Sequence, residues 1–117
     1  MSKLDKAEIL LREAKEDLKH GCYNKAVSAS YFAVRLFVES FFPGLMTRRD
    51  DKIANALFRE VERKVGRERA EEIKSSYLFL FDLRKKADHR ADTFGEEAEE
   101  IVAIAERLMR EIGEILK

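Results

Sequence analysis

The stretch from Tyr23 to Phe42, YNKAVSASYFAVRLFVESFF, has neither glycine nor proline in its 20 residues, and it decides the fold. Its apolar residues are too widely spread to share one narrow stripe of a helix. A helix that is apolar on nearly all sides is normally buried by its neighbours or spans a membrane. Polar residues such as Asn24, Arg35 and Glu39 interrupt the stretch too often for a bilayer span. We therefore expect it to be the central helix of a helical bundle.

The composition indicates a single globular domain that covers residues 1–117. The chain is 45% hydrophobic and 39% charged, which argues against disorder, and its formal net charge is zero. A neutral chain has no overall attraction for nucleic acid, so contact with RNA must come from a local basic patch. Cys22 is the only cysteine, which excludes an intrachain disulfide and favours a small packing residue.

Two further expectations come from composition and from targeting signals. No signal peptide or membrane-spanning segment is visible, so we expect a cytoplasmic protein without a membrane partner. Glu, Lys and Arg are abundant while Gln and Trp are absent, which is typical of proteins from hyperthermophiles.

The spacing of apolar residues predicts helices along the first half of the chain and no strands. Residues 4–18 repeat apolar side chains every three or four positions, and this helix should begin near Ser2 and end at Gly21. The central helix should stop at Pro43, and residues 47–51 are expected to form a polar loop. A third helix should carry apolar residues between positions 53 and 65 and end at Gly66.

The second half of the chain predicts two more helices. The fourth should run from about Glu68 to Ala87 or Asp88. The last should follow Thr93 and Glu96, which fit a capping box, and its apolar residues from 98 to 115 keep a nearly strict heptad register. Helices joined by short loops pack mainly antiparallel. We therefore predict an all-α fold, an up-and-down four-helix bundle with an additional short helix, the third being the candidate for the short or irregular element.

The fourth helix carries the most informative chemistry, in the segment SSYLFLFDLRKKADHR from residue 75 to residue 90. A helix turns about 100° per residue, which places Arg84 in the same sector as Tyr77 and Leu80, at the centre of the apolar face. A buried guanidinium without a partner is costly, so Arg84 needs a carboxylate, backbone carbonyls or a ligand. Asp88 stands one turn further along that sector and is a candidate structural partner, which leaves open whether Arg84 serves only the fold.

His89 is placed differently from Arg84. In a continuous helix its side chain would point roughly 140° away from that of Arg84. The two side chains can share a site only if the helix breaks near Asp88, or if each meets its counterpart across a dimer. A histidine at a helix C-terminus is also a common solvated partner of the helix dipole, so a structural and a catalytic interpretation both stand.

Three motifs resemble those of a known family. The first helix ends in Gly-x-Tyr, the second reads AVSASYFAV, and the fourth contains Leu-Arg-x-x-Ala-Asp. These motifs make nearly the whole chain similar to a HEPN domain, named for higher eukaryotes and prokaryotes nucleotide-binding. The resemblance implies a helical up-and-down bundle that is usually dimeric. Many HEPN proteins carry an arginine followed a few residues later by a histidine, and Arg84 and His89 match this motif with four residues between them.

The resemblance also implies a chemistry, because in HEPN ribonucleases two such motifs face one another across the dimer and cut RNA without a metal ion or other cofactor. RNA supplies its own nucleophile, the 2′-hydroxyl. Arg84 would hold the scissile phosphate with a planar charged fork, and His89 would act as general acid or base. Five basic residues would add attraction for the RNA backbone, although a solvated basic surface explains each of them equally well. They are Lys85, Lys86, Arg90, Arg48 and Arg49.

Three functional hypotheses remain open, because other HEPN proteins are inactive or act as the toxin or partner subunit beside a minimal nucleotidyltransferase. The first is a toxin-like endoribonuclease that acts as a homodimer and is paired with a nucleotidyltransferase antitoxin. The second is a non-enzymatic subunit that binds a nucleotide or such a partner. The third is a plain helical dimerisation module.

Two remaining features bear on partners. Around Phe79, the fourth helix has more apolar surface than one core face can cover, which favours a homodimer interface over a broad internal core. A di-metal carboxylate bundle needs inward Glu and Glu-x-x-His pairs on facing helices. The chain does not offer that pattern, so we expect no metal.

Overall fold

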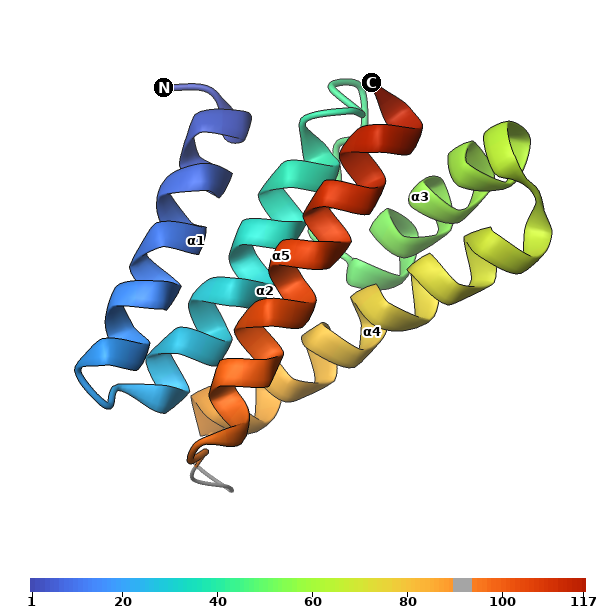
Figure 1. Ribbon diagram of the computed structural model, residues 1–117. Helices are drawn as coiled ribbons and strands as arrows, with labels where there is room; N and C mark the ends of the chain where they lie inside the picture. The colour runs from blue at the N-terminus through green and yellow to red at the C-terminus, as the bar shows by residue number, and fades with distance from the viewer. Residues whose placement is uncertain (90–93) are drawn as a thin grey trace.

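The computed structural model of the chain describes residues 1–89 and 94–117, with the side chain of His89 left out. Within these residues it contains five helices and no strand, which confirms the predicted all-α fold (Figure 1). None of the described helices is both long and apolar enough to cross a lipid bilayer. The helices are α1 (Lys3–Lys19), α2 (Tyr23–Glu39), α3 (Asp50–Val65), α4 (Arg67–His89) and α5 (Glu97–Leu116).

Local signals in the sequence set several of the helix ends. The hydroxyl of Ser2 accepts a hydrogen bond from the amide of Asp5 at 3.1 Å and so caps α1. Gly21, with a φ of 70°, turns the chain from α1 into α2. α2 ends at Glu39, ahead of Pro43, which has no amide hydrogen to continue a helix.

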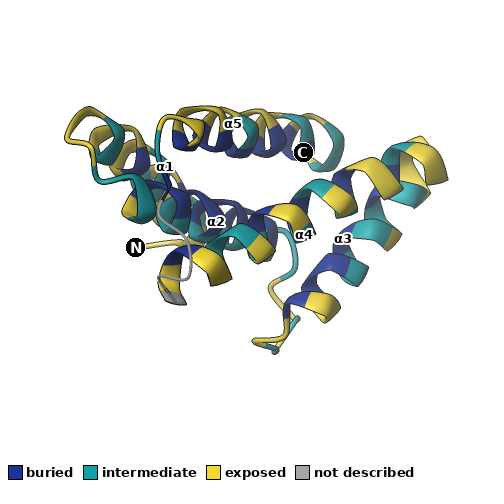
Figure 2. Cartoon of the chain, turned by 90° about the horizontal axis from the view of Figure 1, so that it is seen from below, coloured by how far each residue is buried: buried dark blue, intermediate teal, exposed yellow. Residues whose placement is uncertain are grey.

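α2 is the centre of the bundle, as predicted. It packs against α1, α4 and α5. α1 and α2 run in opposite directions, and so do α4 and α5 (Figure 1). Figure 2 shows the buried positions of α2 and α5 turned toward the interior between them. The buried residues of α2 are Ala26, Val27, Ser30, Tyr31, Ala33, Val34, Phe37 and Val38.

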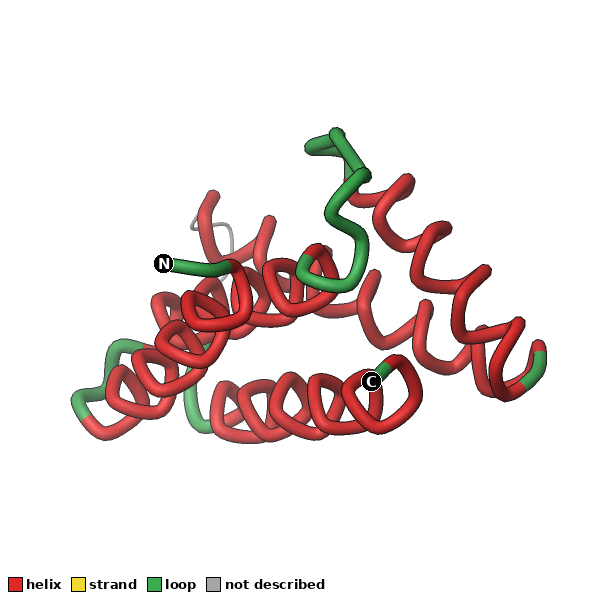
Figure 3. Tube along the Cα trace, turned by 90° about the horizontal axis from the view of Figure 1, so that it is seen from above, coloured by secondary structure: helices red, strands yellow, loops and turns green. Residues whose placement is uncertain are grey.

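α3 and the first half of α4 form a hairpin that extends to one side of the other helices (Figure 3). α3 packs mainly against α4 and only slightly against α2. Ile53, Leu57 and Val61 are fully buried along its inner face. The position of the hairpin relative to the bundle therefore depends on the course of α4 and on the few contacts at the start of α3.

Several details differ from the sequence prediction. α3 is not a short or irregular element, since its 16 residues make it only one residue shorter than α1. It reaches that length because its inner face packs against α4 over several turns. It also begins at Asp50, inside the segment expected to be a loop, and the acidic pair Asp50 and Asp51 suits the positive end of the helix dipole. α5 begins without a side-chain cap from Glu96, and Thr93 lies outside the described residues.

Gly66 reverses the chain between α3 and α4 with φ at 98° and ψ at 168°, a region that residues with a Cβ rarely adopt. We predict that Gly66→Ala lowers the free energy of unfolding by about 1–3 kcal/mol. The cause would be backbone strain alone, because a Cβ at this position meets no other atom within 4 Å. Chemical denaturation measures the effect. Gly44→Ala is the control, since Gly44 has the same open space without a positive φ, and equal losses in both variants would contradict this account of the turn.

Candidate functional site

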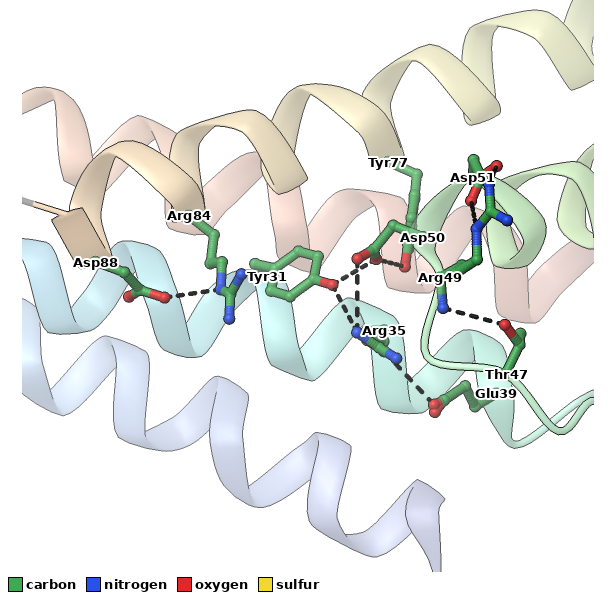
Figure 4. A network of polar contacts seen from close by, with 10 residues as sticks. All are labelled: Tyr31, Arg35, Glu39, Thr47, Arg49, Asp50, Asp51, Tyr77, Arg84 and Asp88. Atoms are coloured by element: carbon green, nitrogen blue, oxygen red, sulfur yellow. Dashed lines mark hydrogen bonds and ion pairs between the residues drawn. The ribbon is translucent and has the colours of Figure 1, made fainter.

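A polar stripe runs along the face of α2 that meets α4 and the start of α3. Its members are Asn24, Ser28, Tyr31 and Arg35, spaced by four, three and four residues. This spacing places them in one line on a helix. Each of them contacts α4 or Asp50, the first residue of α3. The stripe therefore aligns α2 with the helix that carries Arg84 (Figure 4).

Arg84 lies at the edge of the core, where α4 packs on α2. Its guanidinium carbon is 5.1 Å from the ring centre of Phe32 and 5.6 Å from that of Tyr31, within range of a cation–π attraction. Its Nε atom is 2.8 Å from Oδ2 of Asp88, one turn further along α4. Because Nε is buried and makes no hydrogen bond, this contact is a close ion pair rather than an aligned hydrogen bond. Of the Arg84 side chain, 31% remains exposed.

Asp88 is held from two sides. Its Oδ2 faces Arg84, and its Oδ1 accepts a hydrogen bond from the hydroxyl of Ser28 at 3.0 Å. With 38% of the Asp88 side chain exposed, water screens the ion pair, so the pair contributes little to stability. Its main consequence is geometric, because it fixes the direction of the Arg84 guanidinium against α2.

The carboxylate of Asp50 is buried and joins three helices (Figure 4). Its Oδ1 accepts hydrogen bonds from the hydroxyls of Tyr31 on α2 and Tyr77 on α4, the second at 2.6 Å. Arg35 donates to the Tyr31 hydroxyl at 3.2 Å, and its Nη1 lies 3.5 Å from Oδ2 of Asp50. A buried carboxylate needs such donors, and here three side chains supply them.

Burial, and after it the hydrogen bond to Asp50, raise the pKa of Tyr31 to about 12. The same two causes, in the same order, raise the pKa of Tyr77. Both tyrosines are therefore protonated at neutral pH and act as donors to the carboxylate. The network is a fixed structural element and not a proton relay.

Tyr31 connects this buried network to Arg84. Its hydroxyl bonds to Asp50, while its ring lies under the guanidinium and packs edge-on against Phe32, with the two ring centres 4.9 Å apart. Only 1% of Tyr31 is exposed. A shift of Asp50 would therefore move the ring against which Arg84 is placed.

Asn24 ties the end of α4 to the segment that follows it. Its Nδ2 donates to the backbone carbonyl of Ala87 at 3.3 Å, and its Oδ1 accepts from the amide of Phe94 at 3.0 Å. One side chain on α2 thus holds the chain on both sides of residues 90–93. This contact fixes where α4 ends in relation to α2.

α4 continues through Asp88 to His89 without a break. Of the two arrangements in which Arg84 and His89 can share a site, the one that requires a break near Asp88 is therefore not observed. The side chain of His89 and the whole of Arg90 lie outside the described residues. The other arrangement, which uses a second copy of the chain, stays a prediction.

The predicted basic residues fall into two separate groups. Lys85 and Lys86 are exposed beside Arg84, and Lys85 Nζ stands 5.1 Å from the ring centre of Phe81. Arg48 and Arg49 lie in the loop before α3, at the opposite end of α2 from Asp88. Figure 4 shows this separation for Arg49, which pairs with Asp51 at 2.9 Å.

The sequence pointed to Arg84 and Asp88 but missed the residues that support them. In the sequence, Asn24, Ser28 and Arg35 are polar interruptions of an apolar helix. Their spacing of three and four was the available signal, because a regular polar line on a buried helix must face polar partners. Nothing in the sequence indicates that Asp50 is the shared partner of Tyr31, Arg35 and Tyr77.

The described residues contain no cluster of three or more His, Cys, Asp or Glu side chains placed to hold a metal ion. What the site offers instead is an oriented, partly exposed guanidinium on a helix that ends in Ala-Asp-His. An arginine of this kind suits the binding of a phosphate or carboxylate group.

Together these features define a small all-α helical bundle with an oriented, partly exposed arginine. The family model described as HEPN domain matches residues 2–115 of the 117-residue chain, and the chain therefore belongs to the HEPN domain family. This family is often linked to ribonuclease or nucleotide-binding roles. A comparison with curated proteins found no match, and neither did a comparison with solved structures.

The Asp50 network can be tested by comparing two neighbouring aspartates. We predict that Asp50→Ala lowers the free energy of unfolding by about 3 kcal/mol, because it leaves the hydroxyls of Tyr31 and Tyr77 buried without an acceptor. Asp51→Ala is the matched control, since 59% of that side chain is exposed and its partner is the exposed Arg49. Thermal unfolding of both variants measures the difference. Similar midpoints would contradict the role given to Asp50.

Proposed function

We propose that the chain acts as a homodimer that cleaves RNA without a metal ion, with Arg84 binding the scissile phosphate and His89 transferring protons. The observation that carries this proposal is the state of Arg84. Two rings and Asp88 orient its guanidinium, 31% of the side chain stays exposed, and it makes no hydrogen bond to the residues that the structure describes. The exposed part of the guanidinium is therefore oriented and open to a ligand, in a family often linked to ribonucleases.

The proposed reaction uses the 2′-hydroxyl of RNA as the nucleophile. Its oxygen bonds to the adjacent phosphorus, the bond from phosphorus to the 5′-oxygen breaks, and the products are a cyclic phosphate and a free 5′-hydroxyl. His89 takes the proton from the 2′-hydroxyl and, as imidazolium, returns it to the departing 5′-oxygen. Arg84 stabilises the negative charge that grows on the phosphate oxygens. Lys85, Lys86 and Arg90 add attraction for the RNA backbone.

The dimer in this proposal follows from the course of α4. Because the helix is continuous, positions 84 and 89 of one copy lie roughly 140° apart around its axis. The Arg84 of one copy therefore works with the His89 of the second. The exposed part of Arg84, at the edge where α4 packs on α2, is the place that the second copy has to reach. Helical spacing places position 89 in the same line as Leu78 and Lys85, next to Phe79 on the outer side of α4.

We further propose that the chain is the toxin-like half of a pair with a minimal nucleotidyltransferase that acts as the antitoxin. Membership of the HEPN family supports this pairing. A neighbouring reading frame with a Gly-Ser and a later Asp-x-Asp pattern would strengthen it.

A second candidate function is a non-enzymatic subunit that binds a nucleotide or a nucleotidyltransferase partner. The observation in its favour is that Asp88 already neutralises Arg84 at 2.8 Å. In this version Arg84 holds α4 against α2, and ligand binding needs no histidine.

The two functions differ in a cleavage assay on single-stranded RNA in EDTA. We predict that the unmodified protein cleaves, and that Arg84→Ala and His89→Ala each lower kcat/KM by about a hundredfold or more. Arg67→Ala is the matched control, because Arg67 forms the same kind of pair, with Glu71 at 3.2 Å, at the other end of α4.

The control should keep full activity, and thermal unfolding should show that all three variants remain folded. Absence of cleavage by the unmodified protein would remove the nuclease proposal and favour the non-enzymatic one. Cleavage that is unchanged in the Arg84 and His89 variants would assign the activity to other residues.

A further inference from the structure

A groove of about 770 Å³ opens between α1, the second half of α2 and the loop that leads to α3. Its size falls within the range of pockets that hold small ligands, about 300–1,000 Å³. Apolar side chains form most of its lining, among them the aromatic ring of Phe32 and the side chain of Leu36. Its charged residues are Lys3, Arg35, Arg48 and Glu39.

The groove is lined by more positively than negatively charged side chains. Glu39 is the only carboxylate among the lining residues, and it lies 3.6 Å from Lys3 and 3.7 Å from Arg35. Arg35 is also neutralised by Asp50. Arg48 is exposed and forms no ion pair with the residues that the structure describes. The groove therefore carries surplus positive charge, and Arg48 is the cation free to meet an anionic ligand.

The groove and the surroundings of Arg84 share one side chain, Phe32. Phe32 lines the groove and is also the ring over which the Arg84 guanidinium stands, at 5.1 Å from its centre. Figure 4 shows Arg84, Tyr31, Arg35 and Glu39 following one another along α2. A ligand bound to Arg84 and extending along α2 would therefore enter the groove at Phe32 and reach Arg48 at the far side.

We propose that this groove binds the nucleotide next to the scissile phosphate of a single-stranded RNA, an inference that rests on the proposed function. The base lies against Phe32 and the apolar lining, and the next backbone phosphate meets Arg48 and Lys3. Single-stranded nucleic acid is bound in this way elsewhere, by an aromatic surface for the base beside a positively charged path for the backbone. The combination of a ring, an apolar floor and an unpaired arginine beside Arg84 favours RNA over a protein segment.

Fluorescence anisotropy with a labelled single-stranded hexauridylate tests the proposal in a protein that carries Arg84→Ala, so that binding is measured without cleavage. Adding Arg48→Gln should weaken binding about fivefold at about 0.1 M salt and lower the slope of log K against log salt by about 0.7. Adding Phe32→Leu, which keeps the apolar bulk but removes the ring, should weaken binding at least about fivefold. Arg63→Gln is the matched control and should change neither quantity appreciably, because Arg63 is an exposed arginine of α3 that pairs with Glu60 and does not line the groove.

Several outcomes would overturn the groove as an RNA site. They are a lack of hexauridylate binding, equal effects of Arg48→Gln and Arg63→Gln, or unchanged affinity with Phe32→Leu in a folded protein. If Arg48→Gln instead changes the molecular mass in solution and not the affinity for RNA, the groove is a protein interface. Binding that follows the prediction while the cleavage assay is negative would reject the nuclease proposal and retain the groove.

Discussion

The buried carboxylate of Asp50 is the contact on which the candidate site depends. It begins α3, accepts the hydroxyls of Tyr31 on α2 and Tyr77 on α4, and faces Arg35. α3 has few other contacts with α2, so this carboxylate is the main link between the start of α3 and the central helix. Breaking a buried charged network of this kind costs several kcal/mol, because the remaining groups lose their partners inside the protein.

Tyr31 connects the Asp50 network to the candidate functional residue Arg84. Its hydroxyl is bound by Asp50 and its ring supports the guanidinium of Arg84, so the buried network and the exposed cation share one side chain. Ser28 and Asp88 fix the same guanidinium from the other side. Arg84 is thus oriented before any ligand arrives, and an oriented cation loses less entropy on binding a phosphate than a free one. The ion pair between Arg84 and Asp88 is partly exposed and contributes little to stability. The contacts of Tyr31 and Ser28 therefore serve to orient the guanidinium.

Much of the fold could be predicted from the sequence, because the helical period of apolar residues and the glycines Gly21 and Gly66 report on local structure. The position of Arg84 in the apolar sector of α4 could be predicted for the same reason. The contacts between helices could not, since periodicity shows which face is buried but not which residue it meets. Asp50 illustrates the limit. Asp50 falls in a segment whose sequence predicts a polar loop, yet it begins a helix and accepts hydrogen bonds from Tyr31, 19 residues before it, and Tyr77, 27 residues after it.

The site also explains why a single copy of the chain is insufficient for the proposed chemistry. α4 runs straight past Asp88 and is held at its end by Asn24, so the backbone does not bend to bring position 89 to Arg84. A second copy solves this problem if it brings its own position 89 to the exposed part of Arg84, beside the edge where α4 packs on α2. The groove beside Phe32 then lies next to Arg84 in each copy, and a bound RNA would touch residues of both copies near the cut.

The measurement that tests this account most directly mixes two inactive variants, Arg84→Ala and His89→Ala, after subunit exchange has been verified by native mass spectrometry. If Arg84 of one copy works with His89 of the other, each mixed dimer has one intact site, and the mixture should recover about one quarter of the original activity. If both residues of a site came from the same copy, no mixed dimer would have an intact site. A mixture that exchanges subunits yet stays as inactive as its parents would contradict the shared site.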